Sequence, residues 1–163
     1  MKLNLIRSRI DKVVEWTLIG IVAVMTLNVL WQVFTRFVLQ TPSSYTEELA
    51  RYLLVWLGLL GGAYAVGRKA HLAIDLLPMM LKGRKKLVLE IVIQSFVLLF
   101  ATAVVLWGGI ELVGLTLTLQ QVSAALQVKL GYVYLVLPIS GALMIFYSIT
   151  FIVENIGLLR GDT

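Results

Sequence analysis

The chain of 163 residues contains no cysteine and one histidine, His71. The absence of cysteine excludes a disulfide framework, a thiolate zinc or iron–sulfur site and a cysteine nucleophile. A single histidine does not suffice for bis-histidine haem ligation within the chain. These absences remove most classes of small redox membrane protein.

Charged residues are also scarce, at 14%, whereas hydrophobic residues make up 60% of the chain. Soluble domains carry about 25% charged residues. A soluble globule of this length could not bury so much apolar surface, and a disordered chain would be poor in hydrophobic residues. The composition therefore predicts an integral membrane protein.

Charged residues divide the sequence into four apolar blocks, and three of them are long enough to cross about 30 Å of hydrocarbon as an α-helix. The second block, 16 uncharged residues from Tyr52 to Gly67, is slightly short by itself and reaches that length when it is counted from Tyr45. The predicted spans cover residues 13–36, 45–67, 88–112 and 130–153. We therefore expect an all-α integral membrane protein with four transmembrane helices and short amphipathic interfacial helices. Residues 1–163 form a single four-helix transmembrane domain in this interpretation.

Two local signals refine the second and fourth spans. Ser44 and Glu47 have the spacing of a capping box, with Ser44 as the N-cap and Glu47 reaching back to its amide. In the fourth span, Pro138 and Gly141 predict a kink or a close approach of another helix.

Lysine and arginine are distributed unequally between the two sides of the membrane. Eleven of the 14 lie in the N-terminus, in the loop after the second span and at the C-terminus, and three lie in the other two loops. The positive-inside rule then predicts that both termini are cytoplasmic. This distribution also accounts for the net charge of +5 without a nucleic-acid partner.

Two connecting segments have patterns typical of interfacial structure. Residues 70–77 are apolar apart from His71 and Asp75, and we expect a short helix on the cytoplasmic surface. His71 and Asp75 are expected to form a hydrogen-bonded pair, because a metal would need more ligands than this segment offers. Residues 114–129 alternate polar and apolar side chains and are expected to fold back on the outer face as a short amphipathic segment.

The deep parts of the four spans contain no ionisable residue, although transport sites and proton relays usually depend on one. Asn28, Gln32 and Arg36 recur every four residues and share one face of the first span. We interpret Asn28 and Gln32 as interhelical hydrogen-bonding residues in preference to a substrate path. No nucleophile, metal cluster or phosphate-binding loop indicates an enzyme.

A charged cluster begins the second span. Glu47 and Glu48 precede Arg51 by four and three residues, the acid-first order that favours ion pairs on a helix. Acidic residues also suit a helix N-terminus. Together with Arg36, this cluster is either a clamp that fixes helix packing or a contact for a partner protein, and both interpretations stay open.

The same residues belong to a pattern that extends over essentially the whole chain. The pattern comprises Arg36-Phe37, Thr46-Glu47-Glu48-Leu49-Ala50-Arg51-Tyr52, Val55-Trp56, Arg68, His71, Asp75 and Leu137-Pro138. It resembles the small membrane subunit of tripartite ATP-independent periplasmic (TRAP) transporters.

The resemblance implies a multi-pass protein of the bacterial inner membrane. In such systems a periplasmic substrate-binding protein delivers an organic acid, such as sialic acid or a C4-dicarboxylate, to a large multi-span membrane subunit. The large subunit works as an elevator and binds the substrate and the coupling sodium ions. The small subunit is then a scaffold that contacts the large subunit and membrane lipids and has no cofactor of its own.

Two other functions stay open at this point. An autonomous exporter or channel formed by homo-oligomerisation would need polar residues around a common axis through the full membrane. The polar stripe that begins at Asn28 reaches only one surface. An anchor subunit of a respiratory enzyme is disfavoured by the lone histidine.

Overall fold

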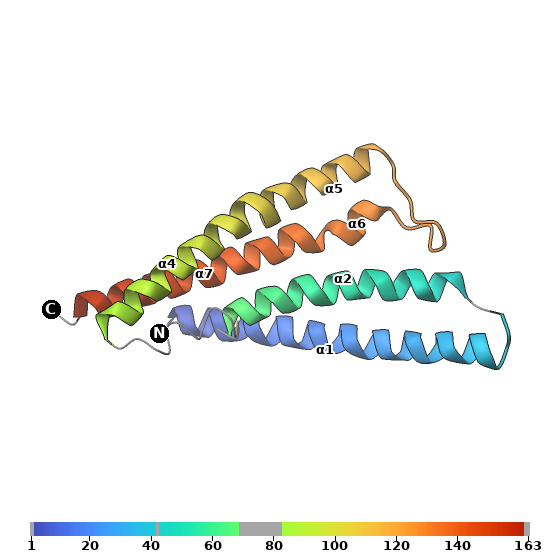
Figure 1. The fold of residues 1–163 in the computed structure, drawn as a ribbon, viewed down its shortest axis with the longest axis horizontal. Helices are drawn as coiled ribbons and strands as arrows, with labels where there is room; N and C mark the ends of the chain where they lie inside the picture. Colours follow the sequence, from blue (N-terminus) through green and yellow to red (C-terminus); the bar gives the residue numbers. More distant parts are fainter. Residues whose placement is uncertain (1, 42, 69–82, 162–163) are drawn as a thin grey trace.

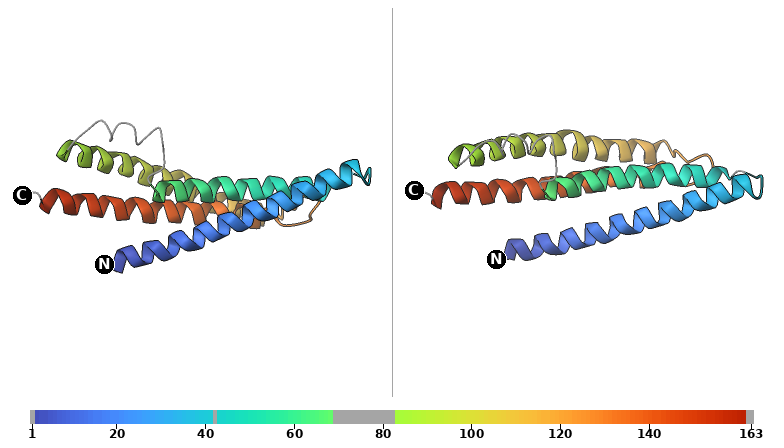
Figure 2. Two further views of the ribbon diagram at one scale, coloured as in Figure 1. Left: turned by 90° about the horizontal axis from the view of Figure 1, so that it is seen from below. Right: turned by 60° about the horizontal axis from the view of Figure 1, so that its bottom comes forward.

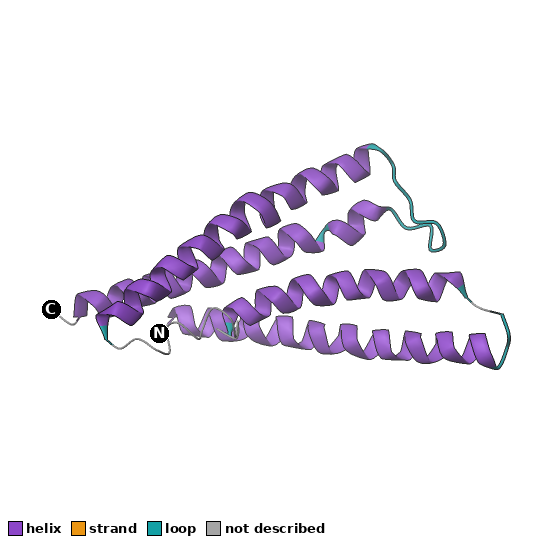
Figure 3. Cartoon of the chain, viewed as in Figure 1, coloured by secondary structure: helices purple, strands orange, loops and turns teal. Residues whose placement is uncertain are grey.

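The computed structural model describes residues 2–41, 43–68 and 83–161. These residues are almost entirely helical, and Figure 3 shows that short loops join the helices. The elements are α1 (Lys2–Phe37), α2 (Ser44–Gly67), α4 (Arg84–Phe100), the π-helical segment η1 (Ala101–Trp107), α5 (Gly108–Thr118), α6 (Leu130–Tyr134) and α7 (Val136–Gly161). The prediction of an all-α membrane protein is confirmed.

Four helical stretches are long and apolar enough to cross a membrane. They are Ile6–Phe37, Ser44–Gly67, Arg84–Thr118 and Leu130–Arg160. The first, third and fourth are longer than predicted, because the helices continue through the charged residues that served as boundaries. Even the shortest, at 24 residues, is about 36 Å long and exceeds the hydrocarbon layer. The charged helix ends therefore reach the headgroup region.

The four spans are arranged in a row with α7 near its centre (Figures 1 and 2). The first span packs on α2, α2 packs on α7, and α7 packs on α4 and η1. In the most apolar part of the fourth span 39% of the residues are buried, against 11% in the first and third spans. The outer spans consequently present wide apolar faces, with side chains such as Trp16 and Phe96 about 70% exposed. α1 begins and α7 ends at the same end of the helix axes (Figure 1).

The N-cap of the second span lies one residue before the predicted cap. Ser43 is the N-cap, with an extended backbone at φ −91° and ψ 113°. Its hydroxyl lies 2.6 Å from that of Thr46, which donates back to the Ser43 carbonyl at 2.8 Å. The capping box at Ser44 and Glu47 is therefore wrong, because the buried Thr46 pairs with Ser43 and the Glu47 carboxylate pairs with Arg51 instead.

Of the two predicted interfacial segments, the structure describes the one at residues 114–129. Residues 114–118 complete α5, and residues 119–129 form a loop closed by an antiparallel bridge between Val122 and Lys129. The amphipathic segment predicted there is therefore not an interfacial helix. A left-handed Gln120 and hydrogen bonds from Gln120 and Gln121 back to the last turn of α5 end the helix before the segment can continue it. The helix predicted at residues 70–77 lies outside the described residues.

The fourth span is interrupted at Leu135, between α6 and α7. Pro138 has no amide hydrogen to donate to the carbonyl of Tyr134, and its ring crowds that carbonyl. The third span approaches closely at the same level, where a Cβ on Gly141 would lie 2.8 Å from the backbone nitrogen of Leu106 in η1. The close approach predicted at Gly141 is confirmed, and the helix is interrupted three residues before Pro138.

The close approach leads to a testable expectation for the Gly141→Ala variant. The added methyl group would collide with the backbone of η1, so we expect the variant to lose about 1–3 kcal/mol of stability. Gly157→Ala is the matched control, because a Cβ there meets nothing within 4 Å. Thermal unfolding in detergent should show a lower midpoint for Gly141→Ala only. Equal midpoints for the two variants would contradict the tight contact.

Candidate functional site

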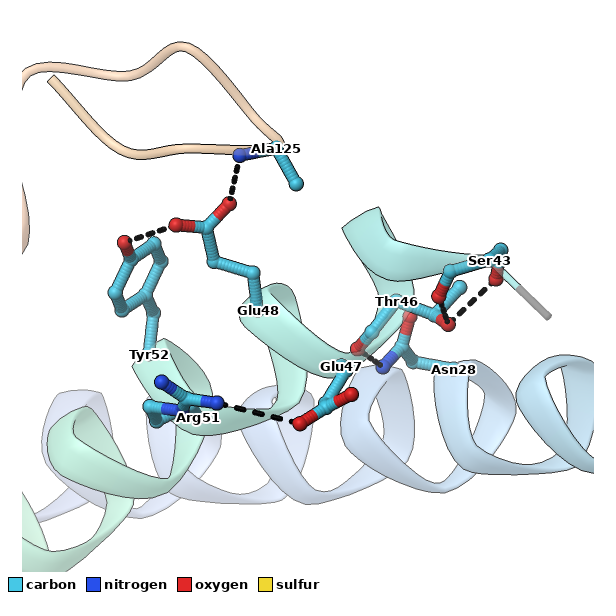
Figure 4. A network of polar contacts seen from close by, with 8 residues as sticks. All are labelled: Asn28, Ser43, Thr46, Glu47, Glu48, Arg51, Tyr52 and Ala125. Atoms are coloured by element: carbon cyan, nitrogen blue, oxygen red, sulfur yellow. Dashed lines mark hydrogen bonds and ion pairs between the residues drawn. The ribbon is translucent and has the colours of Figure 1, made fainter.

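The Glu48 carboxylate joins the start of α2 to the tip of the loop between α5 and α6 (Figure 4). Its Oε1 accepts hydrogen bonds from the Tyr52 hydroxyl at 2.6 Å and the Ala124 amide at 3.2 Å. Its Oε2 accepts from the amides of Ala125 and Leu126, both at 2.8 Å. Three successive amides around one carboxylate form an anion-binding nest. We call Glu48, Tyr52 and residues 124–126 the loop anchor.

The loop itself is shaped to present those three amides. Val122 and Lys129 pair across its base, and the amide of Ser123 donates to the carbonyl of Val128 at 2.9 Å. Gln127 adopts a left-handed conformation, with φ at 55°, which turns the chain back after the tip. With four hydrogen bonds received, the Glu48 carboxylate is suited to hold the loop and not to shuttle protons.

The other members of the predicted charged cluster are separated from Glu48. Arg51 pairs with Glu47 at 3.3 Å, and both side chains are about two-thirds exposed. A pair this exposed contributes little, typically about 0.2–1 kcal/mol. Arg36 is exposed and lies over the ring of Phe37. Among the described residues, no ion pair links Arg36 to the two glutamates, and Glu48 pairs with Tyr52 and the loop in place of Arg51.

The polar face of α1 contacts α2 through Asn28. The Asn28 side-chain amide donates to the carbonyl of Thr46 at 2.7 Å, so it forms an interhelical hydrogen bond (Figure 4). Gln32, one turn further, is half-buried. Its backbone carbonyl accepts from the Thr35 hydroxyl, and in the described part of the chain its side chain makes no hydrogen bond to another helix. One of the two predicted interhelical residues thus contacts a neighbouring helix.

A second polar cluster lies at the opposite end of the helix axes, where α1 begins and α7 ends, and we call it the terminal cluster. Arg7 donates to the carbonyl of Gly67 at 2.5 Å and lies over the ring of Phe151. The fully buried Tyr147 donates to Asp11 at 2.6 Å. These contacts tie the beginning of α1 to the end of α2 and to α7.

Salt bridges extend the terminal cluster at its rim. Arg7 lies 4.0 Å from Glu154, and Arg68 lies 3.7 Å from Glu15. Arg68 follows the last residue of α2, and its hydrogen bond to the Tyr64 hydroxyl raises the pKa of the guanidinium above its usual range. The guanidinium therefore stays charged.

The terminal cluster was not predicted from the sequence. A signal was present, because Arg7, Asp11 and Glu15 recur every four residues and so share one face of α1. Arg7 was used only as one of the N-terminal cations that predict the orientation of the chain in the membrane. Tyr147 has no sequence feature that distinguishes it from the other aromatic residues of the spans.

His71 and Asp75 lie outside the described residues. In the ranges that the structure does describe, no group of three His, Asp or Glu side chains could hold a metal ion. The loop anchor joins a helix to a loop by hydrogen bonds, and the terminal cluster joins helices by hydrogen bonds and ion pairs. Their geometry is that of helix fastening, at the two ends of spans whose middle parts are apolar.

Comparison with known proteins identifies relatives for most of the chain. Residues 25–157 match the family described as tripartite ATP-independent periplasmic transporters, DctQ component. The sialic acid TRAP transporter small permease protein SiaQ of Vibrio cholerae is 31% identical over 66% of this chain and 62% of that protein. A putative TRAP transporter small permease protein of Haemophilus influenzae is 26% identical over 94% of both chains.

A third relative is much longer than this chain. The isethionate TRAP transporter permease protein DctMQ of Oleidesulfovibrio alaskensis is 29% identical over 78% of this chain but only 20% of that protein. The matched stretch thus spans less than two-thirds of both the Vibrio protein and this permease.

Proposed function

Because the chain belongs to the DctQ component family of tripartite ATP-independent periplasmic transporters, we propose that it is the small membrane subunit of a transporter for an organic acid. In this role it supports a large membrane subunit and carries no substrate site. The family consists of transporter components, so the chain is a multi-pass transport protein and not an enzyme.

The match to DctMQ is the observation that carries the partner proposal. A stretch equivalent to this chain occupies one-fifth of that permease, so a much longer segment accompanies it there in the same polypeptide. The wide apolar faces of the outer spans offer surface for such a segment. The large subunit binds the substrate and the coupling sodium ions in this proposal, and a periplasmic binding protein delivers the substrate.

The distribution of polar side chains also favours a scaffold over an autonomous exporter. Fixed polar contacts lie at the two ends of the spans, in the loop anchor and the terminal cluster. A path for an acid would need polar groups through the middle, where charge is costly unless it is paired. Two relatives support the proposed substrate class, because they are named as permease proteins of sialic acid and isethionate transporters.

Co-purification tests the partner proposal. The tagged chain, extracted from its bacterial membrane in mild detergent, should retain a much larger multi-span protein. Mass spectrometry should identify that protein as similar to the part of DctMQ that this chain does not match. Recovery of the chain with copies of itself alone would favour the exporter instead.

We further propose that both termini face the cytoplasm of a bacterial inner membrane. The charge distribution supports this orientation, with eleven Lys and Arg on the side of the termini and three on the other. Reporter fusions after Thr163 should then be active as cytoplasmic reporters, and a fusion after Thr41 should be active as a periplasmic one. The reverse pattern at both positions would invert the orientation.

A further inference from the structure

An open apolar groove of about 420 Å³ lies between α1, α2 and α7. Val13 and Val14 form its α1 side, Leu60 its α2 side and Leu143 its α7 side. The α1 residues that line it belong to the N-terminal half of this helix, where α1 diverges from α7 in both views of Figure 2. No part of the loop anchor lines it.

The length of the groove matches one leaflet of a bilayer. It begins beside Arg9 and ends at the level of Thr17, eight residues further along α1. At 1.5 Å per residue this distance is about 12 Å, close to half of the hydrocarbon thickness of about 30 Å. Trp56, near the middle of α2, also lines the groove.

A cation, Arg9, lies at the end of the groove nearest the N-terminus. Arg9 lines it and is exposed, and within the described part of the chain it forms no ion pair with any carboxylate. The neighbouring polar cleft differs, because its three cations, Arg7, Lys12 and Arg68, are matched by Asp11, Glu15 and Glu154. Arg9 therefore places a positive charge at the apolar groove that no carboxylate of the described residues pairs with.

We propose that this groove binds an anionic phospholipid of the leaflet at the N-terminal end, with its phosphate on Arg9 and one acyl chain between Val13, Leu60 and Leu143. Basic pockets between membrane helices hold anionic headgroups in this way. A partner helix fits less well, because it is about 10 Å wide and crosses both leaflets, whereas the groove extends through one. The bound lipid fills the groove beside the direct contacts that the terminal cluster makes between α1 and α7.

Photo-crosslinking tests the site in the full chain in its bacterial membrane, with whatever subunits accompany it. The probes are phosphatidylglycerol and phosphatidylethanolamine, each with a photoreactive group in the acyl chain. Peptides around residues 10–17, 56–60 and 139–143 should be labelled, and more strongly by phosphatidylglycerol. Equal labelling by the two lipids, or labelling no stronger than on the opposite face of α1 around Val22, would overturn the proposal.

Matched variants of Arg9 test the contribution of the headgroup separately from that of the acyl chain. Arg9→Gln should reduce phosphatidylglycerol labelling about fivefold, as expected for one cation near an anionic headgroup, and Arg9→Lys should preserve it. Arg84→Gln, which removes another exposed cation away from the groove, should have no effect. If Arg84→Gln and Arg9→Gln lower labelling equally, the attraction belongs to the surface and the proposal fails.

A bulky residue in the groove gives a second, independent variant. Val13 is 66% exposed, so Val13→Trp should fold and should displace the acyl chains of both probes. Val22→Trp, on the opposite face of the same helix, is its control. Persistent groove labelling in Val13→Trp would overturn the proposal.

Discussion

Glu48→Ala should free the loop at residues 119–129 and prevent assembly with the large subunit, while the four spans remain in the membrane. The substitution leaves the amides of Ala124, Ala125 and Leu126 without their acceptor. It also removes the carboxylate that accepts from the Tyr52 hydroxyl. Residues 124–126 thereby lose their hydrogen bonds to α2, and the side-chain contact between Ser123 and Tyr52 remains beside them.

Hydrogen exchange and co-purification measure the two parts of this expectation. Exchange at the amides of Ala125 and Leu126 should rise toward the rate of an unprotected loop, and recovery of the large subunit should fall to background. Glu48→Gln should also weaken the anchor, because its amide group turns one acceptor into a donor that faces other donors.

Glu47→Ala is the matched control, since it removes the same charge from the adjacent position. The Glu47 side chain is 67% exposed and contacts Arg51 and not the loop. It should leave both exchange and recovery near the unmodified values. If Glu47→Ala and Glu48→Ala reduce recovery equally, charge at the start of α2 matters and the loop anchor does not.

The sequence was sufficient to predict the spans because charge is excluded from the hydrocarbon. Apolar runs with charged residues only near their ends therefore marked all four helices. The helix ends were less well predicted, since helices continue into the headgroup region where charges are tolerated. Pro138 was informative because its missing amide hydrogen acts locally, whatever the rest of the fold does.

The loop anchor could not be predicted from the same reasoning. Glu47 and Glu48 are adjacent and chemically alike, and a helical rotation of about 100° decides which of them faces the loop. The partners of Glu48 are backbone amides 76 to 78 residues away, and backbone amides have no sequence signature. The short-range rule for ion pairs described Glu47 and Arg51 but assigned Glu48 the wrong partner.

The second large effect concerns transport itself. We expect this chain alone to move no organic acid, because its described polar contacts fasten helix ends and the deep parts of its spans lack ionisable residues. Addition of the large subunit and the binding protein should change the result from no uptake to uptake. Such an all-or-none difference exceeds any effect expected from a single substitution here.

Uptake into proteoliposomes under a sodium gradient tests the central claim most directly. Vesicles should contain this chain alone, the large subunit alone, or both, with the binding protein outside and sialic acid or isethionate as the labelled probe. The account predicts uptake only in vesicles that contain both subunits. Specific uptake by vesicles that contain this chain alone would contradict it.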